Sequence, residues 1–355
     1  MAFPPSTLQP IGLRHGIRHC PGGDDWSPCI NLGFGGKTYY VDPVNGLDTN
    51  DGLLPYQSGL LHGPWRTLTY AFSAASPLGV ASAGVKGAYH DYLVQLPGTY
   101  EPLETWPLTI PTTKNSIHVI GSAMPGFDSP TIGTLGAYTN AHATEPTLII
   151  NGKDVSIEGI KIFGPTGNFP VVQVNGELDV LRYNWIRARD DGGNGINIPV
   201  AGAGWFSRIE HNWIDTYVAT AMAILADEQS LHIRDNIIQS EGGGIDLTDN
   251  AHWCDIEWNR IANRMATAGR AYTLLFGVRL QSGAVQNLLD ENRLALAAVG
   301  VSGVQRRVYD LSAAVSNFFG RNFMLGAYEA GPPAGINVAG DLITDGGPGT
   351  GYARD

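Results

Sequence analysis

Four aspartates occupy positions from which they could serve acid–base chemistry. Asp190 and Asp191 lie in a glycine-rich turn, and Asp246 and Asp249 lie in and just after a β-type run further along the chain. Hydrolysis of a polysaccharide needs two carboxyl groups, roughly 5–10 Å apart depending on the stereochemistry. Cleavage by elimination needs a base and neutralisation of a substrate carboxylate, often by calcium. Solvated acids of surface turns are the simpler interpretation, so the four aspartates are candidates only.

Two tryptophans could bind a flat ligand. Trp185 and Trp213 occupy the same position in neighbouring copies of a sequence repeat. Side by side on a surface, their indoles could stack on sugar rings. They could equally pack under a second subunit, since aromatic residues are enriched at interfaces, or simply pack locally. All three interpretations stay open.

No metal or other cofactor is expected. The stretch Asp48–Gly52 superficially resembles a calcium loop, but it lacks the bidentate glutamate that such a loop needs. His15, His19, Cys20 and Cys29 have the ligand types that zinc prefers, but their spacing matches no standard zinc pattern.

These candidates are positioned by an internal repeat of the form apolar-x-x-Asn-x-apolar. Its copies are Leu181–Ile186, Ile209–Ile214, Ile233–Ile238, Ile256–Ile261 and the looser Leu289–Leu294, and the earlier Ile157–Ile162 lacks the asparagine. Successive copies are 23 to 33 residues apart. Between them lie short alternating runs: Val172–Val174, Ile196–Ile198, Met222–Ile224, Ile245–Leu247, Val278–Leu280 and Val299–Val301. A unit this small cannot bury its own apolar face, so copies must stack on one another.

The repeat length selects the architecture. Leucine-rich repeats carry a different leucine pattern, and propeller blades need about 40–45 residues. Coils of short strands stacked about 4.8 Å apart suit a parallel β-helix. We therefore predict an all-β fold, a right-handed single-stranded parallel β-helix with a short N-terminal capping helix and irregular terminal arms. The helix is expected at Trp65–Ala75, where Leu68, Ala71, Phe72 and Ala75 recur at helical spacing before Pro77.

Two further positions of the repeat are periodic. The repeated asparagines should form a buried hydrogen-bonded ladder along the stack, as amides do in cross-β structures; they are Asn184, Asn212, Asn236, Asn259 and Asn292. The residue after the first apolar position reads Glu158, Arg182, Glu210, Arg234, Glu257 and Asp290. It should face away from the core, where the alternating signs of the first five give exposed structural ion pairs worth about 0–1 kcal/mol each.

Composition excludes several classes of function. The net charge is −11, with 22 basic and 33 acidic residues, so the chain should repel nucleic acid. No run of 18 apolar residues exists, so no membrane insertion is expected. Residues 1–20 lack the pattern of a secretory signal, and three cysteines are too few for a disulfide framework, although Cys20 and Cys29 could pair.

Several stretches resemble the right-handed parallel β-helix proteins of the pectate-lyase-like superfamily. Tyr39–Gly52 and Pro64–Ala71 are similar to the opening in which a strand and a short helix plug the first coil. Val94–Tyr100, which contains Leu-Pro-Gly-Thr-Tyr, resembles the first coil, and Leu325–Glu329 resembles the end of the last. The resemblance covers about residues 37–330. It implies the fold and says little of activity, because this fold hosts lyases, hydrolases, epimerases, phage tailspikes and adhesins.

The expected organisation has four parts. Residues 1–36 form an arm for anchoring or assembly, 37–76 the entry strand and capping helix, 77–330 the β-helix, and 331–355 a Gly/Pro-rich tail. No pectate-lyase-type motif of arginines and acids can be transferred residue by residue.

We expect a structural virion protein of a tailed phage: a spike, fibre or capsid-decorating subunit. Three features favour it: the lack of a secretory signal pattern at the N-terminus, the two terminal arms, and the lack of a clear catalytic cluster. It would form a homotrimer, bind other virion proteins through its N-terminal arm, and contact a cell-surface glycan. One alternative is a polysaccharide-degrading enzyme, either a lyase or a glycoside hydrolase. Another is a non-catalytic surface adhesin. Either alternative would act outside the cell or at its surface.

Overall fold

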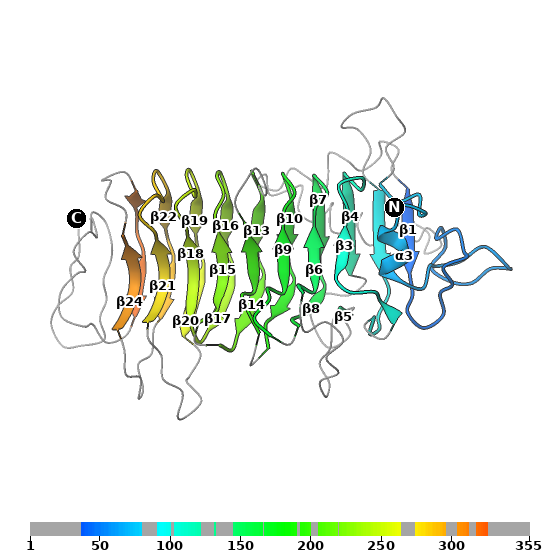
Figure 1. The fold of residues 1–355 in the computed structure, drawn as a ribbon, viewed down its shortest axis with the longest axis horizontal. Coiled ribbons are helices and arrows are strands. Elements are labelled where there is room, and N and C mark those ends of the chain that lie inside the picture. Colours follow the sequence, from blue (N-terminus) through cyan, green and yellow to red (C-terminus); the bar gives the residue numbers. More distant parts are fainter. Residues whose placement is uncertain are drawn as a thin grey trace, which may run out of the picture.

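Each coil of the molecule contributes one strand to each of three parallel sheets. The computed structural model describes residues 37–79, 91–100, 103–121, 131–132, 145–165, 167–189, 192–199, 205–218, 220–263, 274–295, 304–311 and 317–325. Every strand pair within these ranges is parallel, and neighbours in a sheet come from successive coils (Figure 1). The prediction of a parallel β-helix is confirmed, with the right-handed sense that parallel crossovers adopt.

The first sheet has ten strands and the other two have eight each. The first consists of β1 (Thr38–Val41), β2 (Asp91–Gln95), β4 (Ile117–Gly121), β7 (Val155–Glu158), β10 (Val180–Arg182), β13 (Arg208–Glu210), β16 (His232–Arg234), β19 (Asp255–Glu257), β22 (Leu288–Asp290) and β25 (Phe318–Phe319). The second consists of β5 (Thr131–Ile132), β8 (Lys161–Phe163), β11 (Trp185–Arg187), β14 (Trp213–Thr216), β17 (Ile237–Ser240), β20 (Arg260–Asn263), β23 (Arg293–Ala295) and β26 (Phe323–Leu325). The third consists of β3 (Leu108–Ile110), β6 (Leu148–Ile150), β9 (Val172–Val174), β12 (Ile196–Ile198), β15 (Met222–Ala226), β18 (Gly243–Leu247), β21 (Leu274–Leu280) and β24 (Val304–Asp310).

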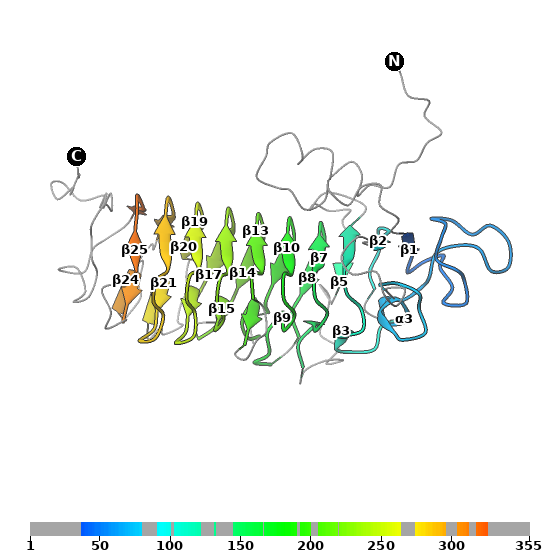
Figure 2. The ribbon, with the colours of Figure 1, turned by 90° about the horizontal axis from the view of Figure 1, so that it is seen from above.

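The core is a column of aliphatic side chains inside the stack. On the first sheet the inward row runs through Ile157, Leu181, Ile209, Ile233 and Ile256, all in register and all at most 1% exposed. Each coil covers the apolar side of the next, so apolar burial accumulates along the axis. Figure 2 shows the same succession of coils from above. No helix in the described ranges is long and apolar enough to cross a membrane.

The predicted capping helix is present but shorter than expected. It is α3 (Leu68–Phe72), and it lies at the N-terminal end of the stack (Figure 1). Thr67 caps its start, because its hydroxyl accepts a hydrogen bond from the Tyr70 amide. The helix ends at the Ser73 cap, and Ala75 is exposed beyond it. The helical spacing of Ala75 was therefore misleading, since Pro77 leaves no room for another turn.

The repeated motif is split between two sheets. In Leu181–Ile186, for example, β10 ends at Arg182, the chain bends at Tyr183 and Asn184, and β11 begins at Trp185. Each full coil thus has three strands, where the sequence indicated at least two. Five of the six expected alternating runs lie in the third sheet. The sixth, Val299–Val301, falls outside the described residues.

The charged row on the outer face of the first sheet is in register as expected. Arg182 bonds to Glu158 at 2.8 Å, and Arg234 lies 3.2 Å from Glu257. The pair Glu158–Arg182 is buried, however, although we expected exposed pairs. Burial alone would raise the pKa of Glu158, but the Arg182 guanidinium, together with His118 and the Ser156 hydroxyl, outweighs burial and lowers the pKa.

A second repeated position, at the corner that leads into the first sheet, carries a hydrogen-bonding side chain in several coils, and the sequence repeat did not reveal it. It lies five residues before each ladder asparagine and reads Asp179, Ser207, Leu231, Cys254, Asn287 and Asn317. Asn287 accepts a hydrogen bond from the Cys254 amide and donates one to the Ala251 carbonyl. In the earlier coils Asp179 accepts in the same way from the Val155 amide. The position closes the turn that leads into the first sheet.

Candidate functional site

A ladder of buried asparagines holds the corner between the first and second sheets. Asn212 shows the pattern: its side-chain nitrogen donates to the Leu181 carbonyl and to Asn236 Oδ1, at 2.7 and 3.1 Å. Its own Oδ1 accepts from the backbone and side-chain nitrogens of Asn184. The predicted Asn184, Asn212, Asn236, Asn259 and Asn292 all stand in this file, and Asn322 extends it by one coil. Asn322 was missed, although Phe319–Met324 fits the motif.

The residue before each ladder asparagine adopts a left-handed backbone conformation. We call these residues the turn row: Tyr183, His211, Asp235, Trp258 and Glu291, with φ between 53° and 56°. Non-glycine residues rarely adopt this conformation, because the Cβ atom crowds the backbone. In the coil before them Gly159 takes the position without that cost. The conformation turns the chain sharply and presents each side chain at the corner.

The residue after each ladder asparagine starts a strand of the second sheet. We call these residues the strand row: Trp185, Trp213, Ile237, Arg260, Arg293 and Phe323, all paired in register. Because one asparagine separates the two rows, they run parallel along the axis. Successive members of a row are about 4.8 Å apart.

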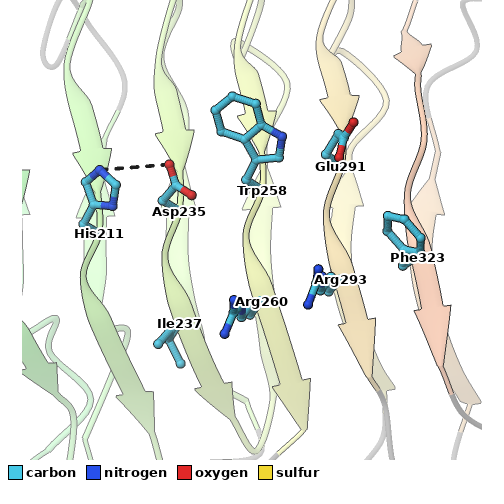
Figure 3. Close-up of a pocket in the computed structure, with 8 residues that line it drawn as sticks. All are labelled: His211, Asp235, Ile237, Trp258, Arg260, Glu291, Arg293 and Phe323. Carbon is cyan, nitrogen blue, oxygen red and sulfur yellow. Dashed lines mark ion pairs between the residues drawn. The ribbon is translucent and has the colours of Figure 1, made fainter. Parts of the chain in front are cut away.

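A pocket of about 410 Å³ lies along the C-terminal part of the two rows. Its lining comes from five successive coils: His211, Asp235, Ile237, Trp258, Arg260, Glu291, Arg293 and Phe323. Figure 3 shows the turn-row members above the strand-row members, with Trp258 between Asp235 and Glu291. We call this pocket and the adjoining parts of the two rows the groove.

The groove carries both signs of charge. His211 Nε2 lies 4.0 Å from Asp235 Oδ2, and Glu291 forms an ion pair with Arg321 of the next coil. Arg260 and Arg293 lie directly opposite each other on β20 and β23. Within the described residues no carboxylate pairs with either guanidinium, and Arg293 lies 5.9 Å from the ring centre of Phe323. The two arginines are thus available to an anionic ligand.

The N-terminal part of the two rows is aromatic. Tyr183 and His211 stack with ring centres 4.9 Å apart, and Trp185 and Trp213 stack at 5.6 Å. Both indole N–H groups donate to one buried carboxylate, Asp215, at 3.0 and 2.8 Å. The two indoles therefore lie side by side with their orientations fixed by Asp215, while their role in binding a glycan or a second subunit stays a prediction.

Of the four predicted aspartates the structure describes Asp246 and Asp249, and neither lines the groove. Asp190 and Asp191 lie outside the described residues. Asp246 faces outward from the third sheet, but it is 1% exposed and bonded to Arg279 and Gln281. That satisfied ion pair suits a structural role.

Asp249 lies beyond the end of β18 and is exposed. It accepts hydrogen bonds from the Gly283 amide and the Ser282 hydroxyl, which lower its pKa. The acids that line the pocket are instead Asp235 and Glu291. A signal for them existed in the sequence: both stand directly before a ladder asparagine, as do His211 and Trp258.

The described residues contain no group of three His, Cys, Asp or Glu side chains arranged to hold a metal ion. The side chains that line the groove supply carboxylates, guanidinium groups, an imidazole and aromatic rings. Its length, spanning several coils, suits an extended ligand laid along the axis.

The known structures that align with this chain share little of its sequence. No family model matches the chain, and neither does any curated protein. Among solved structures, pectate lyase Pel9A aligns over 90% of this chain and 82% of its own, with 13% identity and a TM-score of 0.48. An alginate lyase from Paenibacillus sp. str. FPU-7 aligns over 72% and 95%, with 14% identity and a TM-score of 0.37. DFA-IIIase from Arthrobacter chlorophenolicus A6 without its lid aligns over 83% and 91%, with 10% identity and a TM-score of 0.34.

Proposed function

We propose that this protein binds a linear acidic polysaccharide along the groove and cleaves it. The observation that carries the proposal is the pair Arg260 and Arg293, two guanidinium groups in register without an acidic partner among the described residues. Like charges directly opposite each other in a sheet are unfavourable. A carboxylate or sulfate of a ligand, bonded to both, would remove that cost and gain charge-assisted hydrogen bonds.

The shape of the groove supports an extended ligand. The rows repeat every ~4.8 Å, which is close to the length of one sugar unit in a linear polysaccharide. Trp258 is 47% exposed and stands beside Arg260, so an apolar sugar face could pack on it while an acidic group reaches the arginines. Aromatic side chains supply such apolar contact area.

The groove also contains groups able to transfer protons. Asp235, Glu291 and His211 all line the pocket, and side chains of these types serve as general acids and bases. These groups favour a polysaccharide-degrading enzyme over a protein that only binds glycan. The latter, an adhesin, is the outcome if binding occurs without cleavage.

The virion interpretation stays a prediction. Its supporting features are the N-terminal arm, residues 1–36, and the tail, residues 331–355, and both lie outside the described residues. A homotrimer, attachment to other virion proteins and location in a virion likewise stay predictions. The expected four-part division of the chain is also untested.

The experiment is a binding and cleavage screen of the full chain. Polygalacturonate, alginate and a sulfated glycan are compared with a neutral β-glucan, with affinity measured by calorimetry and cleavage by the release of reducing ends. The double variant Arg260→Gln/Arg293→Gln should bind the acidic polymer at least tenfold more weakly. Arg66→Gln, an exposed arginine near the capping helix, is the matched control and should bind normally.

Two results would overturn the proposal. One is the absence of binding to every acidic polymer in the screen. The other is equal binding by the double variant and the Arg66→Gln control, which would place any binding site elsewhere on the molecule.

A further inference from the structure

Asp235 and Glu291 flank Trp258 in the turn row, one coil to either side of it. All three line the pocket (Figure 3). They directly follow β16, β19 and β22 of the first sheet, and these strands are neighbours in that order. Two strand spacings separate the two acidic residues, which is roughly 10 Å.

This separation distinguishes between modes of glycoside hydrolysis. Retaining enzymes hold their two carboxyl groups ~5 Å apart, because one of them must attack the sugar directly. Inverting enzymes hold them about 6.5–9.5 Å apart, so that a water molecule fits beside the sugar. The two-coil spacing of the backbones, roughly 10 Å, lies near the upper end of the inverting range and is about twice the retaining distance.

We infer that Asp235 and Glu291 are the acid–base pair of an inverting glycoside hydrolysis. The inference rests on the proposed function and specifies its reaction. One carboxylic acid gives its proton to the glycosidic oxygen as the bond from that oxygen to the anomeric carbon breaks. The other carboxylate takes a proton from a water molecule, whose oxygen forms the new bond to the same carbon. Water is consumed, and no oxidant, reductant or cofactor is needed.

The neighbours of the two carboxyl groups suit this arrangement. His211 contacts Asp235 from one side, and its ring is held by the stack with Tyr183. Arg321 contacts Glu291 from the opposite side. The space between the two acids is thus left to Trp258, on which the sugar next to the cleaved bond would lie. His211 and Arg321 act here as positioning residues.

The first test examines the products of an acidic polysaccharide that the full chain binds. Hydrolysis incorporates one oxygen from water enriched in heavy oxygen at each new reducing end, and proton NMR at early times should show the anomer opposite to that of the substrate. Elimination instead leaves an unsaturated sugar that absorbs in the ultraviolet. Retained anomeric configuration or unsaturated products would overturn the inference, while the proposed function would stand.

The second test examines variants. Asp235→Asn and Glu291→Gln should each lower kcat about 100-fold or more, with the affinity for the polysaccharide changed less than twofold. Glu177→Gln, an acidic surface residue that lies in an ion pair with Lys153 away from the groove, should keep full activity. Circular dichroism melting checks that each variant is folded. Addition of azide should restore turnover to the variant that lacks the base only, which assigns the two roles.

Three outcomes count against the inference. Full activity of either acid variant overturns it. Binding without any cleavage overturns both the inference and the catalytic half of the proposed function. Absence of binding removes the proposed function itself, and this inference with it.

Discussion

Arg260 and Arg293 lie directly opposite each other in β20 and β23, and no carboxylate of the described residues bonds to either. Replacing one of them should therefore have opposite effects on stability and on binding. Arg260→Gln removes a like-charge contact and should raise the free energy of unfolding by about 0.2–1 kcal/mol. The same change should weaken binding of an acidic polysaccharide. Urea unfolding and calorimetric titration measure the two effects.

Salt provides the control for this prediction. Screening weakens both the repulsion and the attraction to a polyanion, so both differences between Arg260→Gln and the native chain should shrink as salt is added. A variant that is less stable than the native chain at low salt would contradict the argument.

The asparagine ladder should contribute strongly to stability at its centre. Asn236 is fully buried and exchanges side-chain hydrogen bonds with Asn212, Asn259 and the Ile209 carbonyl. Asn236→Leu leaves several buried polar groups without partners and should cost about 3–5 kcal/mol. Thermal melting measures the loss. Asn168→Leu, at an exposed bend, is the control and should melt within a degree or two of the native chain.

Asp179 should destabilise the protein at neutral pH. Burial raises its pKa well above the usual value, and the nearby Asp154 and Glu177 add to that effect. Asp179→Asn keeps the acceptor for the Val155 amide and adds a donor, like that of Asn287, for the Gly152 carbonyl. We expect a gain of about 1–2 kcal/mol at pH 7.

The sign of the pH dependence follows from the raised pKa. A carboxyl that prefers the protonated form in the folded state stabilises the fold below its unfolded pKa of ~3.9, and this stability is lost as the pH rises through the folded pKa. The advantage of Asp179→Asn should therefore be small near pH 4 and grow toward pH 7. An advantage that instead declines with rising pH would show that the carboxyl is not the cause.

Asp215 should hold the tryptophan pair in place. An asparagine there keeps one oxygen to accept from one indole, but its amide nitrogen meets the other indole N–H as a second donor. Asp215→Asn should therefore cost about 1–3 kcal/mol and weaken the near-ultraviolet circular dichroism of the stacked indoles. Trp205→Phe removes an exposed indole outside the pair and serves as the spectroscopic control. An unchanged spectrum in Asp215→Asn would contradict this role.

The fold could be predicted from the sequence because its determinants keep the same residue type in every coil. Only asparagine makes the full set of hydrogen bonds at a buried ladder position. The same residue type therefore recurs in the sequence, at Asn184, Asn212 and Asn236. The inward positions are equally constrained to aliphatic residues. Their periodicity is enough to give the stacking direction and the approximate coil length.

The groove could not be predicted in the same way. Its turn-row positions hold tyrosine, histidine, aspartate, tryptophan and glutamate, which share a backbone conformation and no chemical type. Aspartates were instead selected for their residue type and local turn context. Asp246 shows why that fails, because its charge is neutralised by Arg279, which is 33 residues away in sequence but adjacent in the next coil.

The ladder has a consequence for how such a surface can change. Each asparagine holds the corner through the hydrogen bonds of its own side-chain amide. The side chains on either side of it are therefore not needed for those bonds. The turn-row and strand-row residues of one coil after another could then be replaced, which would change ligand specificity while the stack of coils stays intact. Trp258 and Arg260 flank the ladder residue Asn259. Placing tryptophan and arginine in the same way on either side of a neighbouring ladder asparagine should move the ligand contact along the axis by one coil.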